Sequence, residues 1–178
     1  IGLAGGSNTY TYVESNPLAS VDPLGLDTAV VFGGPTGGNP FGHVAIGFTG
    51  QGIYSYGTDT PLGGSFTDYL AQQAKYRGST VYILKTTPEQ EARMKAEILK
   101  YRDKSLPDPF NDPAGAARDT CATRTQSALE AAGINSILLP FLSPFPIDTA
   151  ALAVLNGATS VYVPKSGGIP GNLSTFNK

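Results

Sequence analysis

The chain contains a single cysteine, Cys121, and a single histidine, His43. Asp119 and Thr120 precede the cysteine, and both are residue types that cap the N-terminus of a helix. The helix-favouring stretch 122–132 follows, so we expect the thiol in the first turn of a helix. Unpaired N–H groups and the positive end of the helix dipole favour the nucleophilic thiolate there. A thiolate and an imidazole together suffice for nucleophilic attack on a carbonyl carbon.

The histidine lies in the alternating segment 42–48, which predicts a β-strand with Ala45 and Gly47 on the face of the imidazole. These small residues leave space in which the end of the cysteine helix would fit. A turn at 49–52 and a returning strand would supply a third polar group that fixes the tautomer of the ring. The plainer alternative is a buried helix cysteine and a hydrogen-bonded strand histidine without catalytic roles.

The register of this hairpin decides which side chain joins His43, and the pattern leaves two registers open. A four-residue turn puts on the histidine face the side chains of Tyr54, Tyr56 and Thr58. A shift of one residue or a bulge puts there instead those of Ser55 and Asp59.

The composition argues against several classes of function. The chain has 178 residues, a net charge of −2 and a pI of about 5.3, without a stripe of Lys and Arg, so we expect no nucleic-acid partner. One cysteine excludes an internal disulfide, and one cysteine with one histidine cannot form a zinc site of the usual kind. Carboxylates could still bind a hard cation, but we expect no metal and no cofactor. We find neither a signal peptide pattern nor an apolar run long enough to span a bilayer as a helix.

The remaining segments predict a mixed scaffold. Their periodicity indicates strands at 28–32, 80–84 and 160–164 and helices at 65–76, 87–103 and 149–155. The apolar segment 137–147 is expected to be a loop, because its prolines interrupt helices and inner strands. It is interpreted either as a lid over the core or as a substrate wall formed by Leu139, Phe141 and Phe145. The end of the chain from Ser166 is expected to be a frayed tail.

Residues 1–26 carry a separate pattern, Tyr10-x-Tyr12-Val13-x-x-Asn16-Pro17-Leu18-x-x-x-Asp22-Pro23-Leu24-Gly25-Leu26. It resembles the end of a rearrangement-hotspot (Rhs) repeat core, a shell of β-repeats that is followed by an unrelated toxin. The resemblance implies a core end at 1–26 and a C-terminal toxin domain at 27–178, with processing between Leu26 and Asp27. It implies that Asp22 belongs to a self-cleaving aspartyl machinery, and that the partners are an upstream Rhs shell and a cognate immunity protein. The alternative is an ordinary turn-rich arm.

The second part has a different resemblance, carried by Gly42-His43-Val44-Ala45-Ile46 in a strand and Thr120-Cys121-Ala122-Thr123 at a helix start. It resembles the circularly permuted branch of the NlpC-type papain-like superfamily, which includes the lecithin:retinol acyltransferase-like group and in which histidine precedes cysteine. The resemblance implies an α+β, permuted papain-like fold. There, an antiparallel sheet packs against the nucleophile-bearing helix and one or two further helices. It implies catalysis by Cys121 and His43, with Ser55 nearest to the family's third polar residue and Tyr54 and Tyr56 as rivals.

Together these features predict an antibacterial Rhs toxin that acts as a cysteine hydrolase or acyltransferase through a thioester. The favoured substrate is an acyl ester of the cell envelope, above all a phospholipid, with a membrane surface as a further partner. The alternatives are a peptidoglycan amidase or peptidase of the NlpC type, and a non-enzymatic toxin that inserts segment 137–147 into a membrane. We expect a secreted effector that acts at the envelope or in the periplasm of a target cell.

Overall fold

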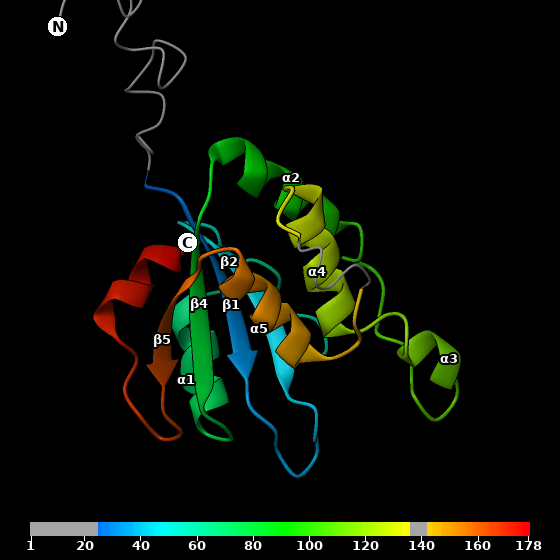
Figure 1. The fold of residues 1–178 in the computed structure, drawn as a ribbon. Helices are drawn as coiled ribbons and strands as arrows, with labels where there is room; N and C mark the ends of the chain where they lie inside the picture. The colour runs from blue at the N-terminus through cyan, green and yellow to red at the C-terminus, as the bar shows by residue number, and fades with distance from the viewer. Residues whose placement is uncertain (1–24, 136–141) are drawn as a thin grey trace, which may run out of the picture.

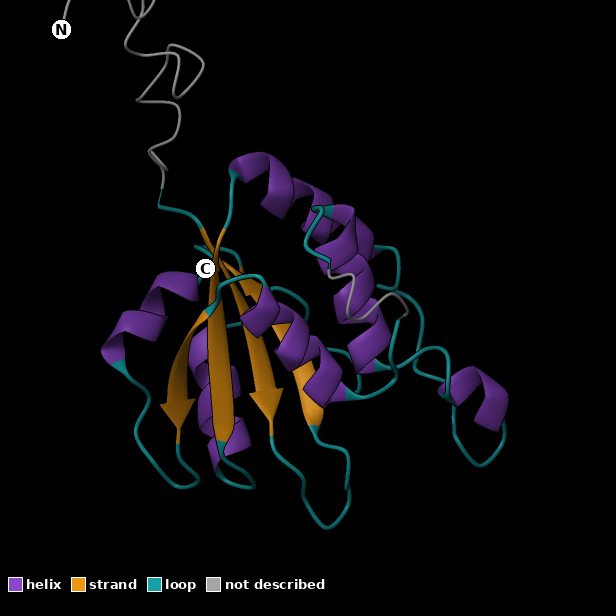
Figure 2. Cartoon of the chain, in the orientation of Figure 1, coloured by secondary structure: helices purple, strands orange, loops and turns teal. Residues whose placement is uncertain are grey.

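The computed structural model describes residues 25–135 and 142–178, which form a mixed α+β fold around a five-stranded antiparallel sheet (Figures 1 and 2). The strand order is β3-β2-β1-β4-β5, so β1 lies at the centre between β2 and β4. The strands are β1 (Asp27–Gly33), β2 (His43–Phe48), β3 (Gly52–Tyr54), β4 (Ser79–Lys85) and β5 (Thr159–Val163). The strands expected from the sequence are therefore confirmed, and the sheet starts at Asp27.

Helices cover both faces of the sheet (Figure 1). One face carries the helices α2 (Pro88–Leu99), α4 (Cys121–Ala131) and α5 (Pro146–Leu155). The other face carries α1 (Phe66–Ala74) and the 3₁₀ helix η3 (Gly171–Phe176). The short helix α3 (Pro113–Ala116) lies apart from the sheet, on the connection that leads into α4.

Alternation along β2 sends side chains into two separate cores. Val44 and its alternate neighbours pack with α4, whereas Ala45 packs on the α1 side. A Cβ at Gly47 would lie 2.7 Å from the ring of Phe66, so glycine lets α1 approach the sheet closely. The expectation that the cysteine helix packs beside Ala45 and Gly47 is wrong, because Phe66 occupies that space and α4 lies against the opposite face.

The β2–β3 hairpin selects one of the two registers left open. Phe48 pairs with Gly52 and Gly47 pairs with Ile53, so the loop is three residues long rather than four. The same register, continued along the chain, puts Ser55 on the face of His43. Tyr54 and Tyr56 belong instead to the core on the α4 side.

Three expectations about element ends are corrected. Helix α2 ends at Leu99 instead of 103, and α5 begins at Pro146, since proline is tolerated in the first turn of a helix. The end of the chain is not frayed, because η3 buries Leu173 and Phe176 completely. The ring of Phe176 lies 4.9 Å from that of Phe66. In the described ranges, the helices are too short or too polar to cross a membrane.

Candidate active site

Helix α4 begins at Cys121, as the capping pattern predicts. Thr120 is the N-cap: its hydroxyl accepts a hydrogen bond from the Thr123 amide at 3.1 Å. The Thr123 hydroxyl accepts one from the Thr120 amide at 2.8 Å, which completes a capping box. The thiol therefore lies in the first turn, where the amides of Cys121 and Ala122 have no carbonyl partner within the helix.

A buried arginine on α4 braces the chain just before the cysteine. The Arg124 side chain is fully buried and makes a bidentate ion pair with Asp119, at 2.6 and 2.8 Å. It also donates hydrogen bonds to the carbonyl groups of Lys104 and Ser105. Its guanidinium carbon lies 4.6 and 4.7 Å from the ring centroids of Tyr56 and Tyr101. Sequence analysis did not predict these Arg124 contacts. The signal for them was an arginine among the small residues of the helix.

Burial controls the charge of the thiol. It raises the pKa of Cys121, and this is the largest influence on the group. The backbone N–H groups of Val44, Ala122 and Cys121 itself lower that pKa, followed by the charge of Arg77. The amides at the helix terminus therefore favour the thiolate, as expected, but desolvation outweighs them and the net shift of the pKa favours the neutral thiol.

The sulfur lies against the backbone of β2 beside the histidine. One of the backbone N–H groups that lower the pKa of Cys121 belongs to Val44, the residue that follows His43. Val44 lies beyond Ile46, the last β2 residue that pairs with β3. The N-terminal end of α4, at Cys121, therefore contacts the part of β2 that is not paired with β3.

His43 is 5% exposed and is held by Ser55. The ring Nε2 lies 2.9 Å from Ser55 Oγ. The structure therefore brings Ser55 to His43, as the shifted register predicts. Burial, and secondly the charge of Arg77, lower the pKa of His43 to about 4. The imidazole is therefore neutral at pH 7 and able to accept a proton.

Cys121 and His43 open into the same cavity, which has a volume of about 450 Å³. Among the described residues, no hydrogen bond links the sulfur directly to the imidazole ring. Much of the remaining wall is apolar, and it includes Phe41, Leu106, Pro107, Pro109, Pro144 and Pro146. The cavity is therefore suited to an uncharged or apolar substrate group next to a polar corner formed by the thiol and the imidazole.

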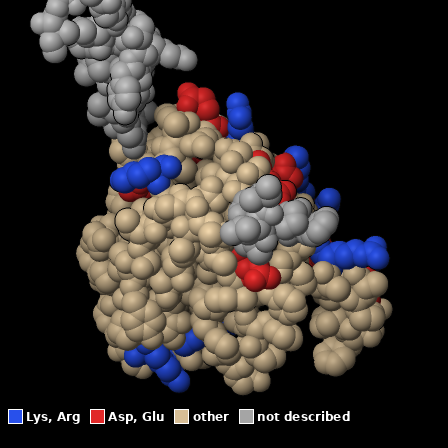
Figure 3. All heavy atoms as spheres, in the orientation of Figure 1, with Lys and Arg blue, Asp and Glu red and all other residues tan. Residues whose placement is uncertain are grey.

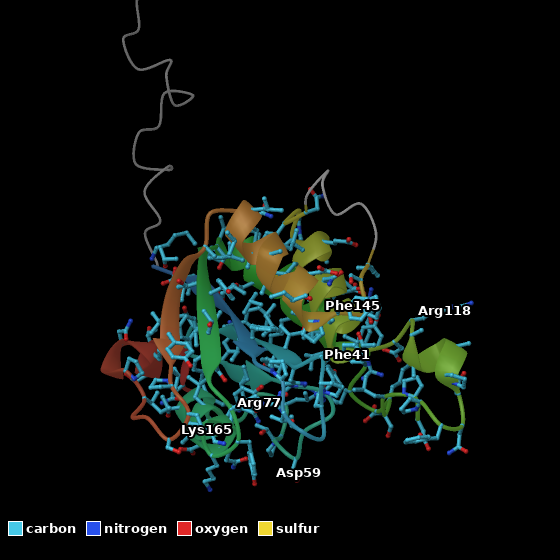
Figure 4. The ribbon with its side chains drawn as sticks, turned by 60° about the horizontal axis from the view of Figure 1, so that its bottom comes forward. Phe41, Asp59, Arg77, Arg118, Phe145 and Lys165 are labelled. Atoms are coloured by element: carbon cyan, nitrogen blue, oxygen red, sulfur yellow. The ribbon has the colours of Figure 1, made fainter. Side chains whose placement is uncertain are left out.

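Of the predicted substrate wall, only Phe145 lies in the described part of the chain. It is 45% exposed, and its ring lies 5.5 Å from that of Phe41, a neighbour visible in Figure 4. Gln126 of α4 positions this segment, because its side-chain carbonyl accepts a hydrogen bond from the Ser143 amide at 2.7 Å. Leu139 and Phe141 lie outside the described residues.

The predicted processing junction coincides with the start of β1, the central strand of the sheet. The carbonyl of Leu26 accepts a hydrogen bond from the Thr86 amide at 3.2 Å. Asp27 is the first residue of β1, and its carboxylate pairs with Lys85 at 2.9 Å. Asp22 lies outside the described residues, so the structure does not describe its surroundings.

In residues 25–135 and 142–178, no group of three or more His, Cys, Asp or Glu side chains is placed to hold a metal ion. The chain matches no protein-family model, and searches of curated proteins and of solved structures returned no significant match. The site must therefore be interpreted from its own geometry.

Proposed function

We propose that the protein is a cysteine-dependent acyl hydrolase or acyltransferase on a permuted papain-like fold. Cys121 is the nucleophile, His43 the general base, and Ser55 the residue that holds the imidazole. The observation that carries this proposal is the shared cavity, which is lined both by Cys121 at the start of α4 and by His43, whose imidazole is held by Ser55. An antiparallel sheet packed against the nucleophile-bearing helix is consistent with it.

The reaction starts from a neutral pair. The lowered pKa of His43 and the raised pKa of Cys121 both favour imidazole and thiol over the ion pair. We propose that a change of the Cys121 side chain to another staggered χ1 rotamer brings the sulfur to the ring. His43 accepts the thiol proton as sulfur attacks the carbonyl carbon, and catalytic hydrogen bonds of this kind commonly tighten only in the substrate complex.

The later steps use the same groups. The carbonyl oxygen becomes an oxyanion, which the first-turn amides of α4 stabilise. Collapse breaks the ester C–O bond, and the leaving alcohol takes the proton from His43. A thioester remains on Cys121 until water, deprotonated by His43, attacks it and releases the carboxylic acid. Transfer to another alcohol or amine instead of water would give an acyltransferase.

The cavity wall favours an acyl ester as the substrate. Phe41, Leu106 and several prolines line the cavity, and the charged side chain in the lining, Asp119, is paired with Arg124. The side shown in Figure 3 has few charged side chains, and its helix α5 exposes Ile147, Val154 and Leu155. We therefore prefer a phospholipid ester to a peptidoglycan amide, whose recognition would need more polar partners.

The biological setting is part of the same proposal. The pattern at residues 10–26 supports an Rhs toxin whose domain begins at Asp27, where the described sheet also begins. Such a toxin would be delivered into a target cell, act at its envelope or in its periplasm, and be neutralised in the producer by a cognate immunity protein.

The test uses the full chain, phospholipid vesicles and, separately, purified peptidoglycan. We expect the wild type to release fatty acid from vesicles and Cys121→Ala to release none. Ser127→Ala, a polar-to-alanine change in the same helix, is the matched control and should remain active. Because the chain has one cysteine, a thioester adduct detected by mass spectrometry maps to Cys121.

Each other outcome contradicts a named part of the proposal. Release of peptides or amino termini from peptidoglycan would replace the lipid substrate while keeping the nucleophile. Equal fatty-acid release by Cys121→Ala would exclude the thiol mechanism. Dye leakage from liposomes caused equally by Cys121→Ala, without hydrolysis, would favour the membrane-inserting alternative.

A further inference from the structure

A second cavity adjoins the candidate active site. It has a volume of about 320 Å³ and shares the lining residues Tyr56, Gly57 and Leu106 with the cavity that Cys121 and His43 line. Gly57 has a φ of +82°, so the chain turns at this boundary in a left-handed conformation that glycine adopts without strain. The two cavities are therefore immediate neighbours.

The second cavity differs from the first in the charge of its walls. Its lining includes residues 102–105, which we call the basic segment, with the cations Arg102 and Lys104 and one carboxylate, Asp103. Serine and threonine hydroxyls also line it. Within the part of the chain that the structure describes, neither cation forms an ion pair. The ammonium of Lys104 lies 5.7 Å from the centroid of the Tyr101 ring instead. The lining therefore has an excess of positive charge without an internal partner.

Helix α4 holds the backbone of the basic segment in place. The fully buried Arg124 donates hydrogen bonds to the carbonyl groups of Lys104, at 2.9 Å, and Ser105, at 3.0 Å. The same guanidinium pairs with Asp119, which lines the catalytic cavity. Buried contacts with α4 therefore set the position of the basic segment relative to Cys121, although its cationic side chains are exposed.

We propose that the second cavity binds the phosphate of a phospholipid headgroup while an ester of the same molecule reacts in the catalytic cavity. The planar guanidinium of Arg102 suits two phosphate oxygens at once, and Lys104 supplies a point charge. With Asp103 beside them, the excess positive charge matches the single negative charge of a phosphodiester. Only a few covalent bonds separate the ester carbonyl from the phosphorus, so the two groups need adjacent cavities. Arg102 and Lys104 then determine specificity and take no part in the reaction at the carbonyl.

This inference rests on the proposed function and assigns the source of its specificity. Binding of a group remote from the reacting carbonyl lowers the barrier only for substrates that carry that group. The test therefore compares two substrates with the same short acyl chains: a phosphatidylglycerol and a diacylglycerol, which lacks the phosphate. Both are used as monomers in solution with the full chain, so that binding to a vesicle surface does not contribute.

We expect the double variant Arg102→Gln with Lys104→Gln to lower kcat/KM for the phosphatidylglycerol roughly tenfold, because charge-assisted hydrogen bonds are lost. Its kcat/KM for the diacylglycerol should stay the same. Glutamine keeps the backbone carbonyl of residue 104, which Arg124 binds, so the fold should remain. Arg93→Gln removes an exposed cation of α2 outside both cavities, and this matched control should leave both values unchanged.

Binding without turnover separates this inference from the proposed function. NMR titration of full-chain Cys121→Ala with the same phosphatidylglycerol should give a dissociation constant that the two glutamine substitutions raise roughly tenfold. Inorganic phosphate is the second probe. If it binds as tightly as the phosphatidylglycerol, the cavity is a site for free phosphate, and the assignment to a lipid headgroup is overturned.

The remaining outcomes also decide between the two proposals. An unchanged kcat/KM for the phosphatidylglycerol in the double variant, or an equal loss on both substrates, would overturn the inference and leave Cys121-dependent hydrolysis standing. Binding of the phosphatidylglycerol that depends on Arg102 and Lys104, without hydrolysis by the wild type, would establish the headgroup site and refute the enzyme proposal.

Discussion

The two halves of the candidate site are held in place by different kinds of interaction. On the cysteine side, the buried Arg124 forms an ion pair with the partly exposed Asp119, the residue just before the helix cap. On the histidine side, the contacts are between neutral groups: Ser55 hydrogen-bonds to the His43 ring, and the Thr58 hydroxyl donates to Ser55. A buried charge tolerates no loss of its partner, whereas a hydroxyl chain can reorganise at small cost. Substitutions on the cysteine side should therefore lower the free energy of unfolding. Substitutions on the histidine side should change the protonation of His43 instead.

The largest effect is expected at the charge pair. Asp119→Ala leaves the guanidinium of Arg124 buried and unpaired, which should lower the free energy of unfolding by about 3–5 kcal/mol. Urea denaturation measures the change. Arg118→Ala, one position earlier and exposed, is the control and should stay within about 0.5 kcal/mol of the wild type. Equal stability of the two variants would show that the brace does not hold the start of α4.

The next effect is expected from the protonation of His43. Its pKa falls from 6.5 in the unfolded chain to about 4 in the fold, so the unfolded state binds the proton more tightly. The free energy of unfolding therefore does not depend on His43 protonation above pH 6.5. It decreases as the pH falls towards 4, by roughly 3 kcal/mol in total. Denaturation of wild type and His43→Gln between pH 7 and pH 4 isolates this contribution.

The difference between those two proteins is the informative quantity, because other groups titrate in the same range. Burial raises the pKa of Glu91, which is remote from the cavity, to about 7, and its slope with pH has the opposite sign. That contribution cancels in the comparison. A parallel pH dependence in both proteins would contradict a buried neutral His43, and NMR titration of the single ring provides an independent midpoint.

The smallest effect is expected at the cap itself. Thr120→Ala removes the hydroxyl that accepts from the Thr123 amide, which should cost about 1 kcal/mol of stability. Thr120→Ser keeps the acceptor and should stay close to the wild type. Thermal or urea unfolding of the pair measures the change. Should both variants be equally destabilised, the methyl packing of Thr120 rather than its capping bond would be the important contribution.

Much of the scaffold was predictable because its signals are local. Short strand-favouring runs identified β1 and β4, and alternation identified β2. The Thr-Pro-Glu-Gln pattern at the start of α2 predicted the capping box that Thr87 and Gln90 form. Thr120 marked the start of α4 in the same way. These features depend on neighbours within about four residues, which the sequence displays directly.

The site was predictable only in part, because several of its features depend on distant contacts. The three-residue loop that selects Ser55 over Tyr54 and Tyr56 follows from pairing across the sheet. Phe66, from a later helix, decides which face α4 can occupy. Neither contact can be inferred from the local sequence pattern of the segments that it affects.

The sequence by itself determined which residues can do chemistry and on which elements they lie: a capped helix that starts at Cys121 and a strand that starts at His43. Only the tertiary structure decided their partners and their charges. Burial raises the pKa of the thiol and lowers that of the imidazole. The packing of the helix and the preceding loop places Arg124 against Asp119. The physical reason is that capping and alternation are properties of neighbouring residues. Desolvation depends on every chain segment that packs around a group.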